Sequence, residues 1–142
     1  MAKKRVIPIV LFGLTASFLV VLTSFFFPAF RQLIQGTAFM VILILIFLLG
    51  LLLLFLVLRQ KVKQPLRKFL LLTSIGAVGF FGGAFLHNFF YGLGVLFNNI
   101  PVLGFLMELL HVAFFLISIL VSPVIFLIGL IGSLIIFLRK KV

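Results

Sequence analysis

Four long stretches of apolar residues divide this chain, and each is long enough to cross a bilayer as a helix. They cover about residues 6–27, 37–58, 69–91 and 106–138. About 20 helical residues rise about 30 Å, the thickness of the hydrocarbon core of a membrane. In lipid the backbone must satisfy its hydrogen bonds within the segment, and these stretches lack the alternation of barrel strands. The sequence therefore predicts an all-α integral membrane protein with four transmembrane helices.

The whole chain, residues 1–142, reads as a single membrane domain. Its residues are 65% hydrophobic and 9% charged, whereas soluble domains are about half apolar and a quarter charged. The first apolar stretch follows a basic N-terminus but is longer than the roughly 7–15 residues of a signal-peptide core. Phe27 also stands three positions before the best late cleavage point, where a small residue is expected. We therefore expect this stretch to be retained as a span.

The positions of the cations predict the orientation of the chain in the membrane. All but one of the twelve Lys and Arg residues fall at the two termini or in the connector 59–68, and the exception is Arg31. By the positive-inside rule, both termini and the connector are cytoplasmic, and 28–36 and 92–105 are outer loops. The sequence thus predicts a multi-pass protein of the cell (cytoplasmic) membrane, with anionic lipids near its cytoplasmic loops. Because the cations flank apolar runs, they do not indicate nucleic-acid binding.

The last apolar stretch is too long for a simple span. From Pro101 to Leu138 it would measure about 57 Å as one continuous helix. Pro101 follows the polar pair Asn98–Asn99, which suits a helix start. Pro123 lies inside the run, where a proline removes a backbone hydrogen bond and kinks a helix. We expect a long last helix that is kinked near Pro123; the alternative is an interfacial helix from Pro101 to about His111, followed by a separate span.

Small residues recur at helical spacing and predict where helices touch. In lipid, small side chains allow two helix backbones to approach closely. The third stretch presents Gly76, Gly79, Gly83 and His87 on one face, and the fourth presents Gly104, Glu108, His111, Phe115, Ser118 and Ser122. Gly13 with Ser17, and Gly129 with Ser133, have the same spacing. We expect these faces to be helix contacts, and the Leu-rich second stretch to be the most exposed to lipid.

The few strongly polar residues of the apolar stretches are predicted to lie at the outer edge of the membrane. Glu108 is the only acidic residue of the chain, and it stands three residues before His111. Counting about 20 residues of each helix from the cytoplasmic side places the outer boundary near Asn88 in the third helix and near Ile119 in the fourth. His87 therefore lies at the boundary, and Glu108 and His111 lie outside it. The sequence thus predicts an outer polar cap, in which membrane ionisable groups pair with one another. Its members are Arg31, His87, Asn88, Glu108 and His111.

The same residues allow a metal site as an alternative to a structural cap. Two imidazoles and one carboxylate, from His87, His111 and Glu108, form a donor set that suits Zn²⁺ or Fe²⁺. The Glu-x-x-His spacing also occurs in di-metal helix bundles, but those sites need further carboxylates that this chain lacks. The structural interpretation requires no cofactor and is preferred.

No motif in the sequence indicates catalysis. The chain has no Asp and no Cys, and it lacks the Gly-x-Ser-x-Gly, P-loop and HExxH motifs. We therefore predict that it is not an enzyme but an accessory or interaction subunit that binds other membrane proteins or forms a homo-oligomer. One alternative is a metal- or proton-handling protein with a His/Glu site at the outer edge. A further alternative is an oligomeric, holin-like pore, which rests on size and charge alone.

Overall fold

The fold is known from a computed structural model, which describes residues 6–139. In chain order, its helices are α1 (Val6–Phe26), α2 (Pro28–Ile34), α3 (Thr37–Arg59), α4 (Leu66–Leu96), α5 (Pro101–Leu116), η2 (Ile117–Val121) and α6 (Ser122–Arg139). Residues 6–139 contain no strand. Four helical stretches are long and apolar enough to span a membrane: α1, α3, α4 and the continuous Pro101–Arg139. The prediction of an all-α protein with four such helices is confirmed.

The third helix is longer than the sequence predicted. The helix α4 continues through Gly92 and Gly94 to Leu96, and α5 begins at Pro101, the helix start that the sequence indicated, within the stretch assigned to a loop. The sequence analysis assigned 92–105 to an outer loop, and the glycines of this stretch would favour turns. A single glycine weakens a helix by only about 1 kcal/mol, and packing against a neighbouring helix overrides that preference. The two helices therefore form a hairpin joined by a turn of only four residues, 97–100.

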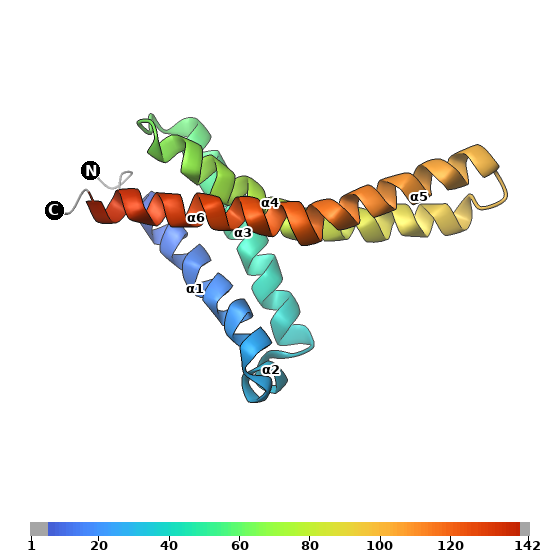
Figure 1. Ribbon diagram of the computed structural model, residues 1–142, viewed down its shortest axis with the longest axis horizontal. Coiled ribbons are helices and arrows are strands. Elements are labelled where there is room, and N and C mark those ends of the chain that lie inside the picture. The colour runs from blue at the N-terminus through green and yellow to red at the C-terminus, as the bar shows by residue number, and fades with distance from the viewer. Residues whose placement is uncertain (1–5, 140–142) are drawn as a thin grey trace.

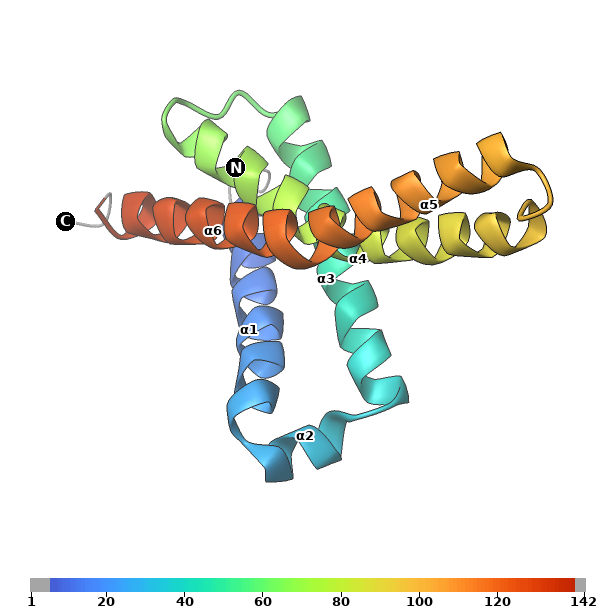
Figure 2. The ribbon, with the colours of Figure 1, turned by 45° about the vertical axis from the view of Figure 1, so that its right-hand side comes forward.

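The helices form two hairpins that diverge from a common crossing region. The helices α1 and α3 lie side by side, with α2 at their far end (Figures 1 and 2). The second half of α4 and α5 form another arm that points away from the first. The helix α6 then runs back past α4, with which it makes the most extensive contact in the molecule. Within residues 6–139, the main contacts of α5 are with α4 and with η2, which directly continues it.

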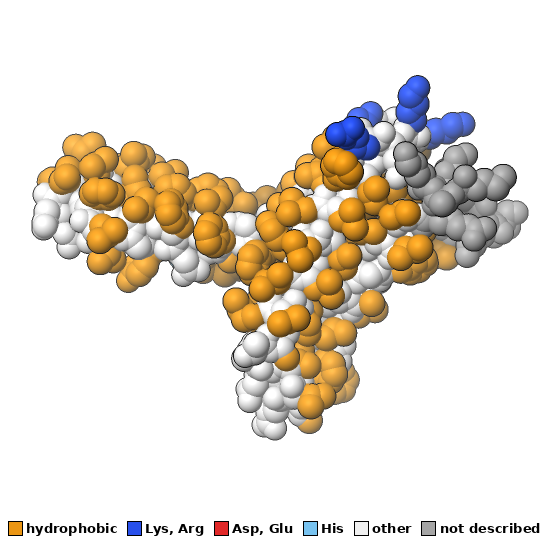
Figure 3. Space-filling model, turned by 180° about the vertical axis from the view of Figure 1, so that it is seen from behind, with side chains coloured by type: hydrophobic (Ala, Val, Ile, Leu, Met, Phe, Trp, Pro, Cys, Tyr) orange, Lys and Arg blue, Asp and Glu red, His pale blue; other side chains and the backbone are white. Residues whose placement is uncertain are grey.

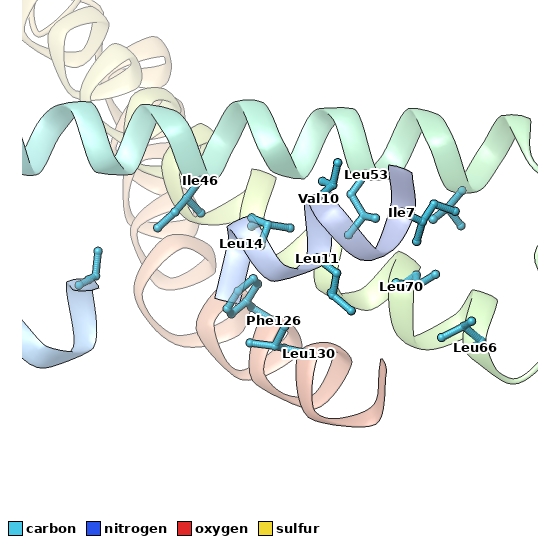
Figure 4. Close-up of a cluster of buried hydrophobic side chains, with 13 residues drawn as sticks. Ile7, Val10, Leu11, Leu14, Ile46, Leu53, Leu66, Leu70, Phe126 and Leu130 are labelled. Carbon is cyan, nitrogen blue, oxygen red and sulfur yellow. The ribbon is translucent and has the colours of Figure 1, made fainter. Parts of the chain in front are cut away.

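The buried core lies in the crossing region, where α1, α3, α4 and α6 meet (Figure 4). Its fully buried large side chains are Leu11, Leu14, Leu53, Val57 and Leu70. None of the residues of α5 is buried. The four long helical stretches are thus held together in the crossing region, and the α4–α5 arm is supported by its own two helices.

Glycines on α4 and α6 bring these two helices into backbone contact. A Cβ added at Gly76 would lie 2.5 Å from the Phe126 amide nitrogen, and one at Gly79 would overlap the Ser122 hydroxyl. One at Gly129 would overlap the backbone nitrogen of Thr73. The predicted small-residue faces are confirmed as helix contacts. The second stretch, which we expect to be the most exposed to lipid, forms α3, and α3 is the least buried of the four, at 22% of its most apolar window.

A π-helical turn, η2, lies immediately before Pro123. The amide of Ser122 bonds to the carbonyl of Ile117, five residues back. A proline ring clashes with the carbonyl four residues earlier, and a π-turn is one way of absorbing such a local mismatch. The turn also places the side chains of Ser118 and Ser122 against α4, where both are buried.

Five of the seven cations in residues 6–139 gather at one end of the molecule. Figure 3 shows Lys and Arg side chains together at the end of the arm formed by the close of α3 and the start of α4. They belong to the 59–68 connector, in which each cation is exposed. Arg31, on α2, stands apart from them at the far end of the α1–α3 arm (Figures 1 and 2).

Candidate functional site: a histidine–glutamate cluster on the α4–α5 hairpin

The two histidines and the only acidic residue come together in the middle of the α4–α5 hairpin. His87 lies on α4, and Glu108 and His111 lie one helical turn apart on α5. The tight turn at 97–100 makes the two helices antiparallel neighbours, so His87 faces the turn of α5 that carries His111. The prediction that docking of the small-residue faces would bring His87 toward Glu108 and His111 agrees with this placement.

His87 is anchored by a hydrogen bond to the backbone of the other helix. Its Nδ1 lies 3.0 Å from the carbonyl oxygen of His111. A carbonyl only accepts hydrogen bonds, so Nδ1 of His87 must carry a proton, and in the neutral ring Nε2 is then the free acceptor. The two imidazole rings also pack against each other, with their centroids 4.6 Å apart. This contact fixes the spacing of α4 and α5 at the site.

Glu108 approaches His111 from the solvent side. Its Oε2 lies 3.3 Å from Nδ1 of His111, but the angles do not meet hydrogen-bond geometry, and this buried nitrogen has no hydrogen-bond partner. We regard the contact as a charge–dipole approach, because the distance alone does not make a hydrogen bond. The side chain of His111 is 18% exposed and that of Glu108 is 67% exposed. The carboxylate therefore keeps most of its hydrogen-bonding capacity.

Aromatic rings complete the surroundings of the cluster. The ring of Tyr91 meets His111 edge-on, with their centroids 5.5 Å apart, and Phe115 lies 5.3 Å from His87. The polar cap predicted from the sequence did not include Tyr91. Its position four residues after His87, on the same helical face, is the signal that could have placed it in the site.

Two members of the predicted polar cap do not join the cluster. Arg31 is exposed on α2, which packs against α1 and α3 and lies at the end of the other arm (Figures 1 and 2). The side-chain amide of Asn88 donates a 2.8 Å hydrogen bond to Ala84 O within its own helix. We had expected the outer ends of all four helices to meet in one layer. They do not, because the two hairpins diverge at these ends.

The metal interpretation meets a geometric obstacle in the cluster. Within residues 6–139, no group of three His, Cys, Asp or Glu side chains is arranged to hold a metal ion. His87 uses Nδ1 for the carbonyl of His111, and the two rings pack against each other. Ligands of Zn²⁺ or Fe²⁺ would instead direct their donor atoms at one point about 2 Å away. A metal site at His87, Glu108 and His111 would need the rings to turn.

The hydroxyl groups nearest the cluster along the chain are engaged in helix packing. The hydroxyl of Ser118 donates a 2.6 Å hydrogen bond to the carbonyl of Phe80 on α4. Thr73 and Ser74 bond to carbonyls of their own helix. A serine nucleophile is activated by a hydrogen bond to a histidine ring. In the described chain, no Ser or Thr hydroxyl forms such a bond with either histidine.

Two cavities lie beside α4. An open pocket of about 420 Å³ lies between the end of α4 and the start of α5 and includes Tyr91, Asn98 and Glu108 in its wall. A second cavity of about 510 Å³ lies in the fork between the two hairpins, and its wall is apolar, with Phe18, Ile46 and Phe80 among its members. The first cavity adjoins the histidine–glutamate cluster through Glu108.

Comparison of the chain with protein-family models, with curated proteins and with solved structures finds no match in any of the three.

Proposed function

We propose that this protein is a small multi-pass protein of the cytoplasmic membrane that acts by binding the helices of a partner membrane protein through its α4–α5 hairpin. Both termini and the connector 59–68 are cytoplasmic in this proposal, and α2 and the 97–100 turn face outward. The gathering of the connector cations at one end of the molecule supports this orientation (Figure 3). The protein needs no cofactor and catalyses no reaction in this role.

The difference in length between the two hairpins carries the proposal. The helices α1 and α3 have 21 and 23 residues, or about 31 and 35 Å, which matches a bilayer core. The helix α4 has 31 residues, or about 46 Å. The tip of the α4–α5 hairpin therefore extends beyond the bilayer core or must tilt strongly within it.

Beside the polar pair Asn98–Asn99, this hairpin tip exposes large apolar side chains. The large side chains of Leu96, Val102 and Phe105 are 72%, 77% and 72% exposed. Large exposed apolar patches that lipid does not cover mark interaction sites. A partner that covers the tip must itself be apolar and must reach the outer edge of the same membrane, which favours another membrane protein.

Site-directed photo-crosslinking in cells tests the proposal. A photoreactive residue at Val102 should give one product of fixed mass, whereas the same residue at Ile9, which is 66% exposed on α1, should not. Replacing Leu96 and Phe105 by Ser should abolish the product. Equal, lipid-only labelling from both positions would refute the proposal. Two differently tagged copies of this chain distinguish a homo-oligomer from another partner.

We further propose that the last helix is bent near Ser122–Pro123. The π-helical turn before Pro123 supports a bend, since such turns and prolines are the usual causes of helix kinks. Spin labels at Val112 and Ile131, both exposed, should move apart when Pro123 is replaced by Ala. An unchanged label-to-label distance would contradict the bend.

A further inference from the structure

The open pocket on the α4–α5 hairpin is lined by two matching helical faces. On α4 and the turn that follows it, the wall includes Tyr91, Gly94 and Asn98; on α5, it includes Gly104, Phe105 and Glu108. Tyr91 and Gly94 lie three residues apart on one side of α4, and Gly104 and Phe105 precede Glu108 by four and three residues on one side of α5. The pocket is therefore built into the seam of the hairpin and encloses about 420 Å³.

Two glycines keep this seam open. A Cβ added at Gly94 would lie 3.5 Å from Cβ of Met107, and one at Gly104 would lie 3.6 Å from the carbonyl oxygen of Phe97. These are ordinary contact distances, so α4 and α5 do not need glycine here in order to approach. The effect of the two glycines is to leave out side chains that would otherwise fill the seam.

The groups around the pocket are those that recognise a cation. Glu108 supplies the only acidic side chain of the chain, and its 3.3 Å approach to His111 does not form a hydrogen bond. Tyr91 and Phe105 supply aromatic rings, whose faces attract cations within about 6 Å. The side-chain oxygen of Asn98 is a further acceptor. Carboxylate and aromatic rings together favour an ammonium group.

The distribution of charge makes this pocket different from the rest of the molecule. The chain carries a net charge of +11, so its surface as a whole attracts anions and repels cations. The cations of the connector 59–68 lie at the opposite end of α4 from the pocket (Figures 1 and 3). Over that separation, which exceeds the Debye length of about 8–10 Å, their repulsion is largely screened.

We propose that this pocket binds an ammonium group through Glu108, Tyr91 and Phe105. The group belongs either to the headgroup of a zwitterionic phospholipid or to a small soluble amine, since both present the same cation. Tyrosine residues are enriched at the level of lipid headgroups, which is consistent with either source. The inference does not depend on the proposed partner-binding function.

The composition of the chain provides a direct probe of the pocket. Tyr91 is the only tyrosine, and there is no tryptophan. Fluorescence excited beyond the absorption of phenylalanine therefore reports on the pocket wall alone. The purified full-length protein in neutral detergent is titrated with three nitroxide quenchers that carry a trimethylammonium, a hydroxyl or a carboxylate group.

The order in which the three quenchers act distinguishes binding in the pocket from attraction by the net positive charge of the protein. We expect the trimethylammonium nitroxide to quench Tyr91 saturably, at a concentration at least about tenfold lower than the neutral one. If net charge alone governs access, the carboxylate nitroxide quenches best, and the proposal is overturned. Equal quenching by the cationic and neutral probes would also overturn it.

Matched variants separate binding from folding. Glu108→Gln preserves shape and should remove the preference for the cationic probe, whereas Glu108→Asp should retain part of it. Asn99→Ser changes the neighbouring residue outside the pocket wall and should have no effect. Elution volume and helical circular dichroism establish that each variant is folded. Loss of the preference in folded Asn99→Ser as well, or its retention in Glu108→Gln, would refute the assignment to Glu108.

Lipid nanodiscs distinguish the two sources of the ammonium group. In discs of phosphatidylcholine, a headgroup ligand would already occupy the pocket, and quenching by the cationic probe should weaken severalfold relative to discs of phosphatidylglycerol. Equal quenching in the two kinds of disc, together with competition by tetramethylammonium, assigns the site to a soluble amine. If neither phosphatidylcholine nor tetramethylammonium weakens quenching by the cationic probe, the proposal is overturned. A negative crosslinking result at Val102 would leave each of these outcomes unchanged.

Discussion

The hydroxyl of Ser118 donates a 2.6 Å hydrogen bond to the carbonyl oxygen of Phe80, and so joins two helices whose residues lie 38 positions apart in the chain. Other hydroxyls of the spans, such as Thr15, Thr23 and Ser24, bond to carbonyls of their own helix. Ser118 can reach across because Gly83, on the facing turn of α4, has no side chain. With the bond from His87 to the carbonyl of His111, it links the last helix to α4 at two levels.

Replacing Ser118 by Ala should weaken the contact between α4 and the last helix. Interhelical hydrogen bonds in membrane proteins contribute about 0.6 kcal/mol on average and at most about 2 kcal/mol. We expect a loss of this size in the free energy of unfolding, measured by titration from mild detergent into dodecyl sulfate. Ser24→Ala, which removes only a bond within α1, is the control. Equal losses for the two variants would contradict a special role for the bond between helices.

Replacing Gly129 by Val should disrupt the fold more severely. A Cβ at this position would overlap the backbone of Thr73, and backbone cannot move aside as the end of a flexible side chain can. Overpacking of a tight interface destabilises by about 1–3 kcal/mol or more, so the melting temperature in detergent should fall. Gly92→Val, where a Cβ would have no neighbour within 4 Å, should leave it nearly unchanged. A stable Gly129→Val variant would mean that α4 and α6 do not pack as described.

Replacing His87 and replacing Glu108 should have different effects. His87→Ala removes the bond to the carbonyl of His111 and two ring contacts, so we expect a loss of about 1–2 kcal/mol. Glu108→Gln should change stability by less than about 0.5 kcal/mol, because the carboxylate is 67% exposed.

Metal content is to be measured on the same two preparations and on the unmodified protein. Bound Zn²⁺ or Fe²⁺ that disappears from folded Glu108→Gln would favour the metal-binding alternative over the structural one. A large loss of folded protein in Glu108→Gln, without metal in the unmodified protein, would instead make the carboxylate a structural anchor. That second result would contradict the small effect that we expect.

Single cysteines should report the orientation of the chain, because it has no cysteine of its own. Gln32→Cys and Asn99→Cys, both at exposed positions, should react in intact cells with a thiol reagent that does not cross membranes. Lys63→Cys, in the connector, should react only after the cells are opened. The reverse pattern would place both termini outside and would overturn the positive-inside assignment.

The four spans were predictable because they depend on local sequence alone. The apolar runs near residues 6–27 and 37–58 match α1 and α3 within one residue, since each is closed by polar residues or proline. The end of α4 was misplaced, because Gly92 and Gly94 resemble a loop when their neighbours are unknown. Only the packing of α5 against α4 decides that the helix continues.

Part of the candidate site was also predictable, because that part depends on local sequence alone. Glu108 and His111 lie on one helical face by spacing, and the small residues before His87 predicted which faces would dock. Tyr91 was missed, and Arg31 was assigned to a cluster that it does not join. Depth counting places residues along the membrane normal, but it says nothing about their lateral positions.

The sequence by itself determined that the chain is helical, that four of its helical stretches are long and apolar enough to span a membrane, and which small-residue faces meet. These properties follow from hydropathy, helical period and residue size. The tertiary structure alone decided that the two hairpins diverge, that Arg31 is separated from His87, and that Tyr91 and Glu108 border one pocket. The physical reason is that crossing angles depend on backbone contact at a few points, such as Gly129 against Thr73. A small change in how those backbones fit moves the far end of a 31-residue helix by a large distance.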